Sequence, residues 1–108
     1  TCCITGINTT ELLVASHIVP WSKDEKNRLN PMNGLCLNAL HDKAFDAGLI
    51  TISADSYCLR VSPKLKKKNS SAYIDQSFLQ LDGQQITLPD KFLPSKAFLK
   101  QHNDFFKI

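Results

Sequence analysis

The sequence lacks any apolar run long enough to cross a membrane, and its first residues do not have the pattern of a signal peptide. Internal repeats and low-complexity tracts are missing too. We therefore expect a cytoplasmic domain that does not enter a membrane. With 108 residues, 43% of them hydrophobic and 21% charged, the chain suits one globular domain with a modest core. Because it begins with Thr1 and not with Met, we expect the C-terminal part of a longer polypeptide.

Cysteine is sparse, and the four cysteines lack the spacing of a zinc ribbon. Cys2 and Cys3 are adjacent, and adjacent cysteines rarely pair with each other. Cys36 and Cys58 have no partner in a C-x-x-C arrangement. We expect buried or free thiols in a reducing compartment, and no structural zinc.

Strong charge of either sign is also lacking. A net charge of +3 and a pI near 8.7 permit nucleic-acid binding without demonstrating it. Positive charge gathers in a polar loop with Lys26 and Arg28, and in a later run with Lys66, Lys67 and Lys68. Each is most simply a solvated loop, and each can alternatively contact phosphates. The lysine run has no interleaved aromatic residues, unlike surfaces that stack the bases of single strands.

The stretch from Leu12 to Phe45 holds two of the three histidines and the only tryptophan. Its β-branched beginning predicts a strand with His17 near the end. A polar loop follows, and the Asn33-Gly34 pair in it is typical of a tight turn. A strand histidine facing a helix histidine, His41, across such a loop can build a metal-assisted hydrolytic site.

The segment after this turn predicts a short strand that continues into a helix ending at Gly48. One face of that helix carries Leu37, Leu40 or His41, and Ala44. Beyond it, residues 49–52 and 57–61 predict a β-hairpin, and residues 85–88 a further short strand. The segment 73–81 fits a helix or a strand. A terminal helix begins at residue 94, and its His102 lies on the surface or packs structurally.

The order His, Asn, His, together with the sequence around each of these residues, resembles the HNH endonuclease family. The three segments are ASHIVPW, NGLCL and LHDKAFDAGLI. The likeness is closest to the branch found in bacterial restriction-type nucleases, whose motif is a ββα-metal finger. It implies an α+β fold, with the finger at residues 12–52 of a domain spanning 1–108, an added β-hairpin and a C-terminal helix. It also implies a divalent-metal-dependent endonuclease acting on double-stranded DNA, in which a homodimer would suit double-strand cutting.

The resemblance assigns roles to the first two motif residues. His17 would be the general base that activates water, a role that suits an imidazole near neutral pH. The other interpretation is a histidine satisfied at a strand end. Asn33 would hydrogen-bond backbone across the loop and hold the two histidine-bearing segments together, which is compatible with its place in a turn.

The resemblance makes His41 a metal ligand, since it follows Asn33 by the spacing of this branch. The alternative is a histidine that packs on a helix face near Phe45. Ser16 stands where many relatives carry an acidic or histidine ligand, so Ser16 or Asp46 would complete the metal site, directly or through water. Asp46 can equally be a polar residue that ends the helix. Mg²⁺ is the first expectation, with Mn²⁺, Ni²⁺ and Zn²⁺ as alternatives.

Two departures from the family leave other functions open. Ser16 favours a catalytically silent DNA-binding module that keeps the fold. Thr5 and Ala39 stand where relatives with a structural zinc carry cysteines, so that zinc is not expected; metal binding by the four cysteines would instead favour an interaction domain. A nuclease acting on RNA also fits the sequence.

Overall fold

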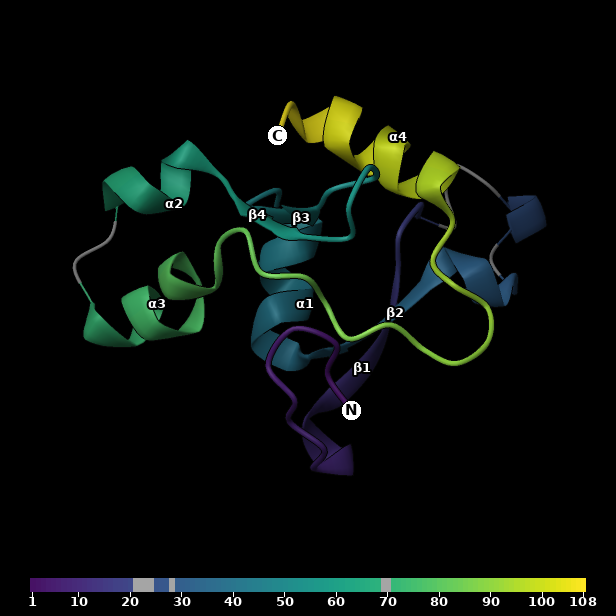
Figure 1. Cartoon of the computed structure of the whole chain (residues 1–108), viewed down its shortest axis with the longest axis horizontal. Coiled ribbons are helices and arrows are strands. Elements are labelled where there is room, and N and C mark those ends of the chain that lie inside the picture. Colours follow the sequence, from purple (N-terminus) through teal and green to yellow (C-terminus); the bar gives the residue numbers. More distant parts are fainter. Residues whose placement is uncertain (21–24, 28, 69–70) are drawn as a thin grey trace.

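The computed structural model describes residues 1–20, 25–27, 29–68 and 71–108. It has an α+β fold in which two small antiparallel sheets are arranged around one central helix (Figure 1). Arg28, which we proposed as a phosphate contact, lies outside the described residues. In the part of the chain that is described, no helix is long and apolar enough to span a membrane.

The first sheet and the central helix form the predicted ββα finger. Strands β1 (Leu13–His17) and β2 (Gly34–Asn38) pair antiparallel, and helix α1 (Ala39–Asp46) follows β2 without a loop. Ser16 lies opposite Leu35 in the register, so the two share one face of the sheet. Both are buried, and Leu35 belongs to the same core cluster as residues of α1. That face of the sheet therefore contributes to the core.

Helix α1 begins and ends with residues suited to these positions. Asn38 is the N-cap, and its side-chain oxygen accepts a hydrogen bond from the backbone N–H of His41. Gly48 follows the helix with φ +74°, a left-handed conformation that glycine adopts without strain. A Cβ atom at Gly48 would overlap the ring of Phe106. This glycine thus ends α1 and also allows the terminal helix to approach it.

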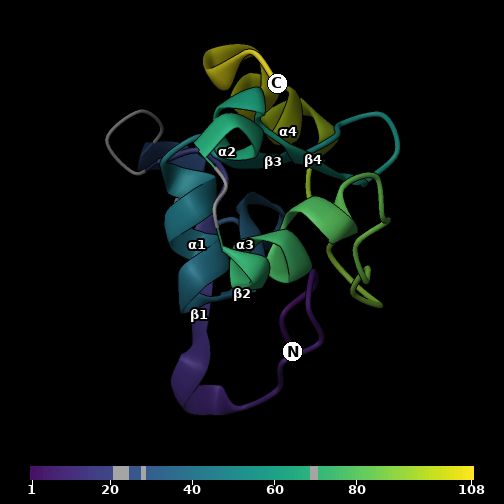
Figure 2. The same ribbon diagram turned by 90° about the vertical axis from the view of Figure 1, so that its left-hand side faces the viewer.

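The second sheet is the predicted hairpin, β3 (Ile50–Ile52) with β4 (Leu59–Val61), and helix α4 (Lys96–Phe106) packs against β3. Both views of the ribbon place α4 beyond the C-terminal end of α1 (Figures 1 and 2). One continuous core joins the finger, the hairpin and α4. Its fully buried members include Leu37, Phe45, Ile50, Leu59 and Leu99.

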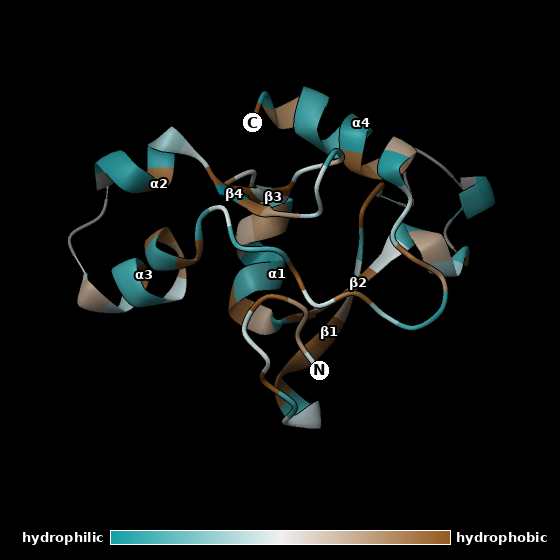
Figure 3. Cartoon of the chain, viewed as in Figure 1, coloured by the Kyte–Doolittle hydropathy of each residue, from teal (hydrophilic) through white to brown (hydrophobic). Residues whose placement is uncertain are grey.

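Two local predictions are wrong. The lysine run is not a loop: it forms helix α2 (Pro63–Lys68), because lysine is a good helix former and Leu65 anchors the turn in the core. Figure 3 shows α2 as mostly hydrophilic beside the hydrophobic β3 and β4. Residues 85–88 form no strand, only a single bridge between Gln85 and Cys58.

The ambiguous segment 73–81 is helical. It forms α3 (Ala72–Ser77) and a 3₁₀ turn, Leu79–Leu81. Three further 3₁₀ turns occur in the described part of the chain: Thr10–Leu12, Glu25–Asn27 and Pro31–Asn33. The last two lie in the connection between β1 and β2, which carries the central asparagine of the motif.

Candidate active site

Asn33 fastens the connection between β1 and β2 to the end of β1. Its side-chain oxygen accepts a hydrogen bond from the Val19 N–H (2.8 Å), and its amide nitrogen donates to the carbonyls of Val19 (3.1 Å) and Asn27 (3.2 Å). The side chain is fully buried. As expected from the sequence, this asparagine hydrogen-bonds backbone across the loop. It thereby fixes the residues that follow His17.

His17 is the last residue of β1 and is half-buried. It lies opposite Gly34, whose lack of a side chain leaves room beside the imidazole ring. Side chains alternate along a strand, so His17 and the buried Ser16 point to opposite faces. The strand thus ends with one residue directed to the core and one half-buried histidine on the opposite face.

The polar face of α1 carries two carboxylates. Asp42 and Asp46 are one helical turn apart and therefore share a face. The pKa of Asp46 is raised from its ordinary value, first by burial and then by the negative charge of Asp42; the positive charges of Lys43 and of His17 act in the opposite direction. The electrostatic effect of His17 on Asp46 places the two side chains near each other. Strand and helix thus combine a histidine with two acids.

Ser16 has a feature that no hydrogen bond of the fold explains. It is only 3% exposed, and its Oγ is the one buried side-chain polar atom without a hydrogen-bond partner among the described residues. Buried hydroxyls normally have a partner, since leaving one unpaired costs about 1–3 kcal/mol. Its oxygen lies on the buried face of the sheet, and Ser16 directly precedes His17. It remains available to a ligand.

His41, which we predicted as a metal ligand, does not point to the same side of α1 as Asp46. Five residues along a helix correspond to a rotation of about 140°, so His41 and Asp46 point to different sides of α1. The His41 ring is 2% exposed and stacks on Phe78 at 4.4 Å between centroids. Nε2 donates to the carbonyl of Ser77 (2.8 Å), and Nδ1 accepts from the amide of Asn38 (3.0 Å). Both ring nitrogens therefore already have protein partners.

The surroundings of His41 are those of a structural cross-link. Burial lowers the pKa of His41 and keeps the ring neutral, despite the opposing effect of the Ser77 carbonyl. The Asn38 amide nitrogen also lies 3.3 Å from Thr5 Oγ1 and 3.5 Å from Cys2 Sγ. Hydrogen bonds at this point thus join the N-terminal segment, α1 and α3. The four cysteines are all free thiols.

His102, the third histidine, is also structural. It is buried, and its ring stacks on Phe45 at 3.8 Å between centroids. Nε2 donates to the carbonyl of Phe45 (3.0 Å), while Nδ1 accepts from the hydroxyl of Thr51 (2.6 Å). Burial lowers its pKa to about 4. This neutral ring fastens α4 to the end of α1 and to β3, and so fixes the wall beside the candidate site.

The lysines that we predicted to contact phosphates differ in their surroundings. Lys26 lies exposed in the 3₁₀ turn Glu25–Asn27, and Lys67 is exposed on α2. Lys66 forms an ion pair with Asp82 at 3.0 Å. The side chain of Lys68 lies outside the described part of the structure. Of these lysines, Lys26 and Lys67 are the exposed ones for which no ion pair is seen among the described residues.

Asp42 is the residue that we did not place in the site from the sequence. Its one-turn spacing from Asp46 was the signal that could have identified it, once the phase of the helix was known. Within the described ranges, no group of three or more His, Cys, Asp or Glu side chains is arranged to hold a metal ion. A metal at this face would therefore need further ligands from Ser16, water or substrate.

A comparison with known protein families identifies the same part of the chain. A family model described as HNH endonuclease matches residues 2–53, which comprise the N-terminal segment, the finger and β3. No curated protein matches the chain. The matched segment contains His17, Asn33 and both acids of α1. The match therefore supports an HNH endonuclease domain within residues 2–53.

Proposed function

We propose that this chain is a divalent-metal-dependent DNA endonuclease whose active site lies between the end of β1 and the acidic face of α1. The observation that carries the proposal is that Asp46 lines the same pocket as Ile18–Pro20, the residues directly after His17, while Asp42 is one helical turn from Asp46. A general base beside two carboxylates is the set of groups that metal-assisted phosphodiester hydrolysis requires.

The donor set at this face fits a hard divalent cation. Burial and, after it, the negative charge of Asp42 raise the pKa of Asp46, and a cation bound by both carboxylates would relieve their repulsion. The unpartnered Oγ of Ser16 is a neutral oxygen donor. Mg²⁺ is commonly bound by one or two carboxylates, several waters and substrate phosphate oxygens. We therefore propose Asp42, Asp46 and Ser16 as the residues that hold the metal, with Mg²⁺ or Mn²⁺ as the ion.

The roles of the side chains follow from this arrangement. His17 would accept a proton from the water that attacks phosphorus, and Asn33 would hold the residues after His17 in place. A bound cation would polarise the scissile phosphate and stabilise charge on the leaving 3′-oxygen. Lys26 and Lys67 would contact neighbouring phosphates and so position the duplex without reading its sequence.

His41 has a different role in this proposal from the one its place in the motif implied. A neutral imidazole whose two nitrogens are already hydrogen-bonded is a poor ligand unless those contacts break. We assign the ligand position to its neighbour Asp42. His41 instead holds α1 in the orientation that directs Asp42 and Asp46 toward His17.

The biological setting is proposed from the family resemblance. The branch that the motif resembles serves restriction of foreign DNA in bacteria, which takes place in the cytoplasm. A chain with one hydrolytic site would cut both strands as a homodimer. Light scattering of the chain with and without a DNA duplex would show whether two copies assemble.

Plasmid cleavage tests the proposed activity. Purified chain should nick supercoiled plasmid in Mg²⁺ or Mn²⁺, and EDTA should stop the reaction. His17→Ala should remove the activity without loss of fold, whereas Asp55→Asn, at an exposed acid remote in sequence from this face, should retain it. A folded chain that binds DNA and cleaves with none of Mg²⁺, Mn²⁺, Ni²⁺ or Zn²⁺ would refute the proposal.

A further inference from the structure

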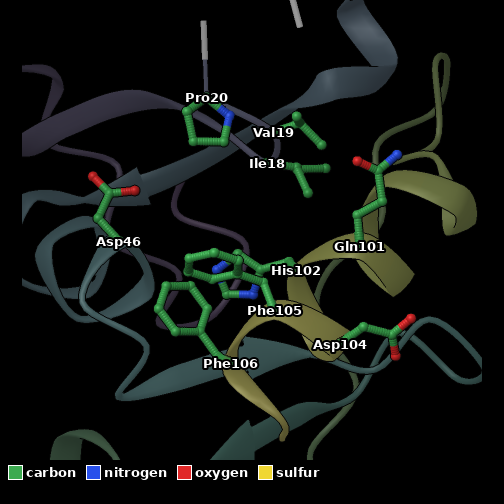
Figure 4. Close-up of a pocket in the computed structure, with 9 residues that line it drawn as sticks. All are labelled: Ile18, Val19, Pro20, Asp46, Gln101, His102, Asp104, Phe105 and Phe106. Carbon is green, nitrogen blue, oxygen red and sulfur yellow. The ribbon is translucent and has the colours of Figure 1, made fainter. Parts of the chain in front are cut away.

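A pocket of about 650 Å³ lies directly beside the candidate active site. Its floor and walls come from the residues that follow His17 and from α4, and Asp46 stands at its edge (Figure 4). Pockets of about 300–1,000 Å³ are the usual size for small organic groups. Asp46 therefore belongs both to the acidic face of α1 and to this pocket.

The walls of the pocket suit a flat apolar group. Ile18, Val19 and Pro20 form one wall, and the aromatic side chains of α4, Phe105 and Phe106, form the other. In Figure 4, Pro20 lies across the opening from the rings, with Asp46 on one side and Gln101 on the other. An aromatic ring system inserted here would contact apolar surface on both faces.

The polar groups at the edge of the pocket disfavour a phosphate and favour a nucleobase. Asp46 and Asp104 are the charged residues among those described that line the pocket, and no lysine or arginine lines it. Two carboxylates disfavour a phosphate, but they accept hydrogen bonds from amino groups. Gln101 adds an amide that both donates and accepts. This chemistry matches the edge of a nucleobase.

We propose that this pocket binds a nucleobase unstacked from the strand that is cut, next to the scissile phosphate. The inference rests on the proposed function, because it takes the phosphate to lie at His17 and Asp46. Asp46 lines the pocket and His17 adjoins Ile18, so the neighbouring nucleotide of that strand reaches the opening. The chain would therefore prefer DNA in which one base is already unpaired, since extruding a paired base costs a few kcal/mol.

Three 30-base-pair duplexes test the proposal by fluorescence anisotropy with His17→Ala, which leaves the DNA intact. One contains a paired 2-aminopurine, one a mismatched 2-aminopurine, and one an abasic site at that position. The mismatched duplex should bind at least about tenfold more tightly than the paired one. The abasic duplex, which is equally disrupted but has no base to insert, should lack this gain. The 2-aminopurine emission should rise on binding, as expected for an unstacked base.

Substitution within the pocket provides the matched control. Gln101→Trp places a bulky side chain at the opening from an exposed helical position, so it should abolish the preference for the mismatched duplex. Gln76→Trp makes the same change on exposed α3, away from this pocket, and should retain the preference. Circular dichroism should show both variants folded.

The outcomes separate this proposal from the proposed function. If the wild-type chain nicks plasmid yet binds the three duplexes equally, the nucleobase pocket is refuted and the nuclease stands. If Gln101→Trp changes no DNA affinity, the pocket takes another occupant, such as an apolar side chain of a partner protein, and the proposal fails. If the chain neither binds nor cleaves DNA, both proposals fail.

Discussion

The two histidines of the motif lie in opposite environments, although they are joined to the same finger. His17 is half-buried at the end of β1 and lies close to Asp46. His41 is 2% exposed, with Ser77 and Asn38 on its two ring nitrogens. The difference shows that the role of a histidine in a motif depends on the groups that contact it. We propose that His17 acts on a substrate and that His41 holds the helix that carries the acids.

Replacing His17 should have the largest effect on activity. His17→Ala should reduce the cleavage rate by about 10²- to 10⁴-fold, because a positioned general base contributes that much. The midpoint of thermal unfolding should change little, since the side chain is only half-buried. Single-turnover cleavage and a thermal melt of the same preparation measure both quantities. A variant that melts much earlier yet cleaves normally would reverse the comparison.

Replacing the acids of α1 should lower activity through metal binding. Asp42→Asn and Asp46→Asn should each raise the Mg²⁺ concentration needed for half-maximal cleavage by about tenfold or more, since even residues that only hydrogen-bond the ligands of a metal contribute about 10- to 100-fold. The neutral amides keep the shape of the acids and remove their repulsion. Metal titrations of cleavage, with Asp55→Asn as control, measure this shift. Unchanged metal dependence in both variants would remove the acids from the site.

Replacing His41 should instead affect stability. His41→Ala removes two buried hydrogen bonds and a ring stacked on Phe78, so unfolding should become easier by about 2–4 kcal/mol. At about 4–8 °C per kcal/mol, the melting midpoint should fall by roughly 8–32 °C. The folded fraction at low temperature should still cleave. A well-folded His41→Ala chain without activity would instead favour a catalytic or ligand role.

Acid should weaken the fold through the buried histidines. The pKa of His102 is lowered from 6.5 to about 4, so the unfolded chain binds a proton at a higher pH than the folded chain does. Stability from this group is complete above about pH 6.5 and declines toward pH 4. Between pH 7.5 and 5 the loss should be about 2 kcal/mol, and His41, whose pKa is also lowered, should add to it. Urea unfolding across this range, compared with His102→Phe, measures the difference.

The fold and one half of the site could be predicted from the sequence for physical reasons. The β-branched run before Pro20 indicated β1, and the turn-forming Asn33-Gly34 pair marked the start of β2. Gly48 marked the end of α1 because a left-handed residue there needs no Cβ. The hydrogen bonds of the Asn33 side chain across the loop were implied by the resemblance to the HNH endonuclease family. These features depend on local chemistry, which the sequence contains.

The rest of the candidate site could not be predicted, because it depends on which side chains of α1 face the core. A shift of one residue in a helix turns every side chain by about 100°, and the sequence did not fix whether Leu40 or His41 faced the core. The cap by Asn38 sets the start of the helix, so that His41 joins Ala44 and Phe45 on the buried face. Asp42 is then on the polar face with Asp46.

The helical state of α2 and the contacts of the third histidine, His102, could not be predicted, because both depend on tertiary structure. Four lysines gave no apolar periodicity, and the burial of Leu65, which adds to the helix propensity of lysine, is seen only in the folded chain. His102 lay on an apolar stripe, but its partner Thr51 belongs to a strand far away in the sequence. Such pairs become visible only when the chain has folded.

Titration with Mn²⁺ tests most directly which face of the finger binds the metal. Calorimetry would compare the wild-type chain, the double variant Asp42→Asn/Asp46→Asn, and His41→Gln, whose amide can still donate to Ser77. We predict that the double variant loses Mn²⁺ binding, whereas folded His41→Gln keeps an affinity within about threefold of wild type. Retained binding in the double variant together with lost binding in His41→Gln would contradict the account and make His41 the ligand.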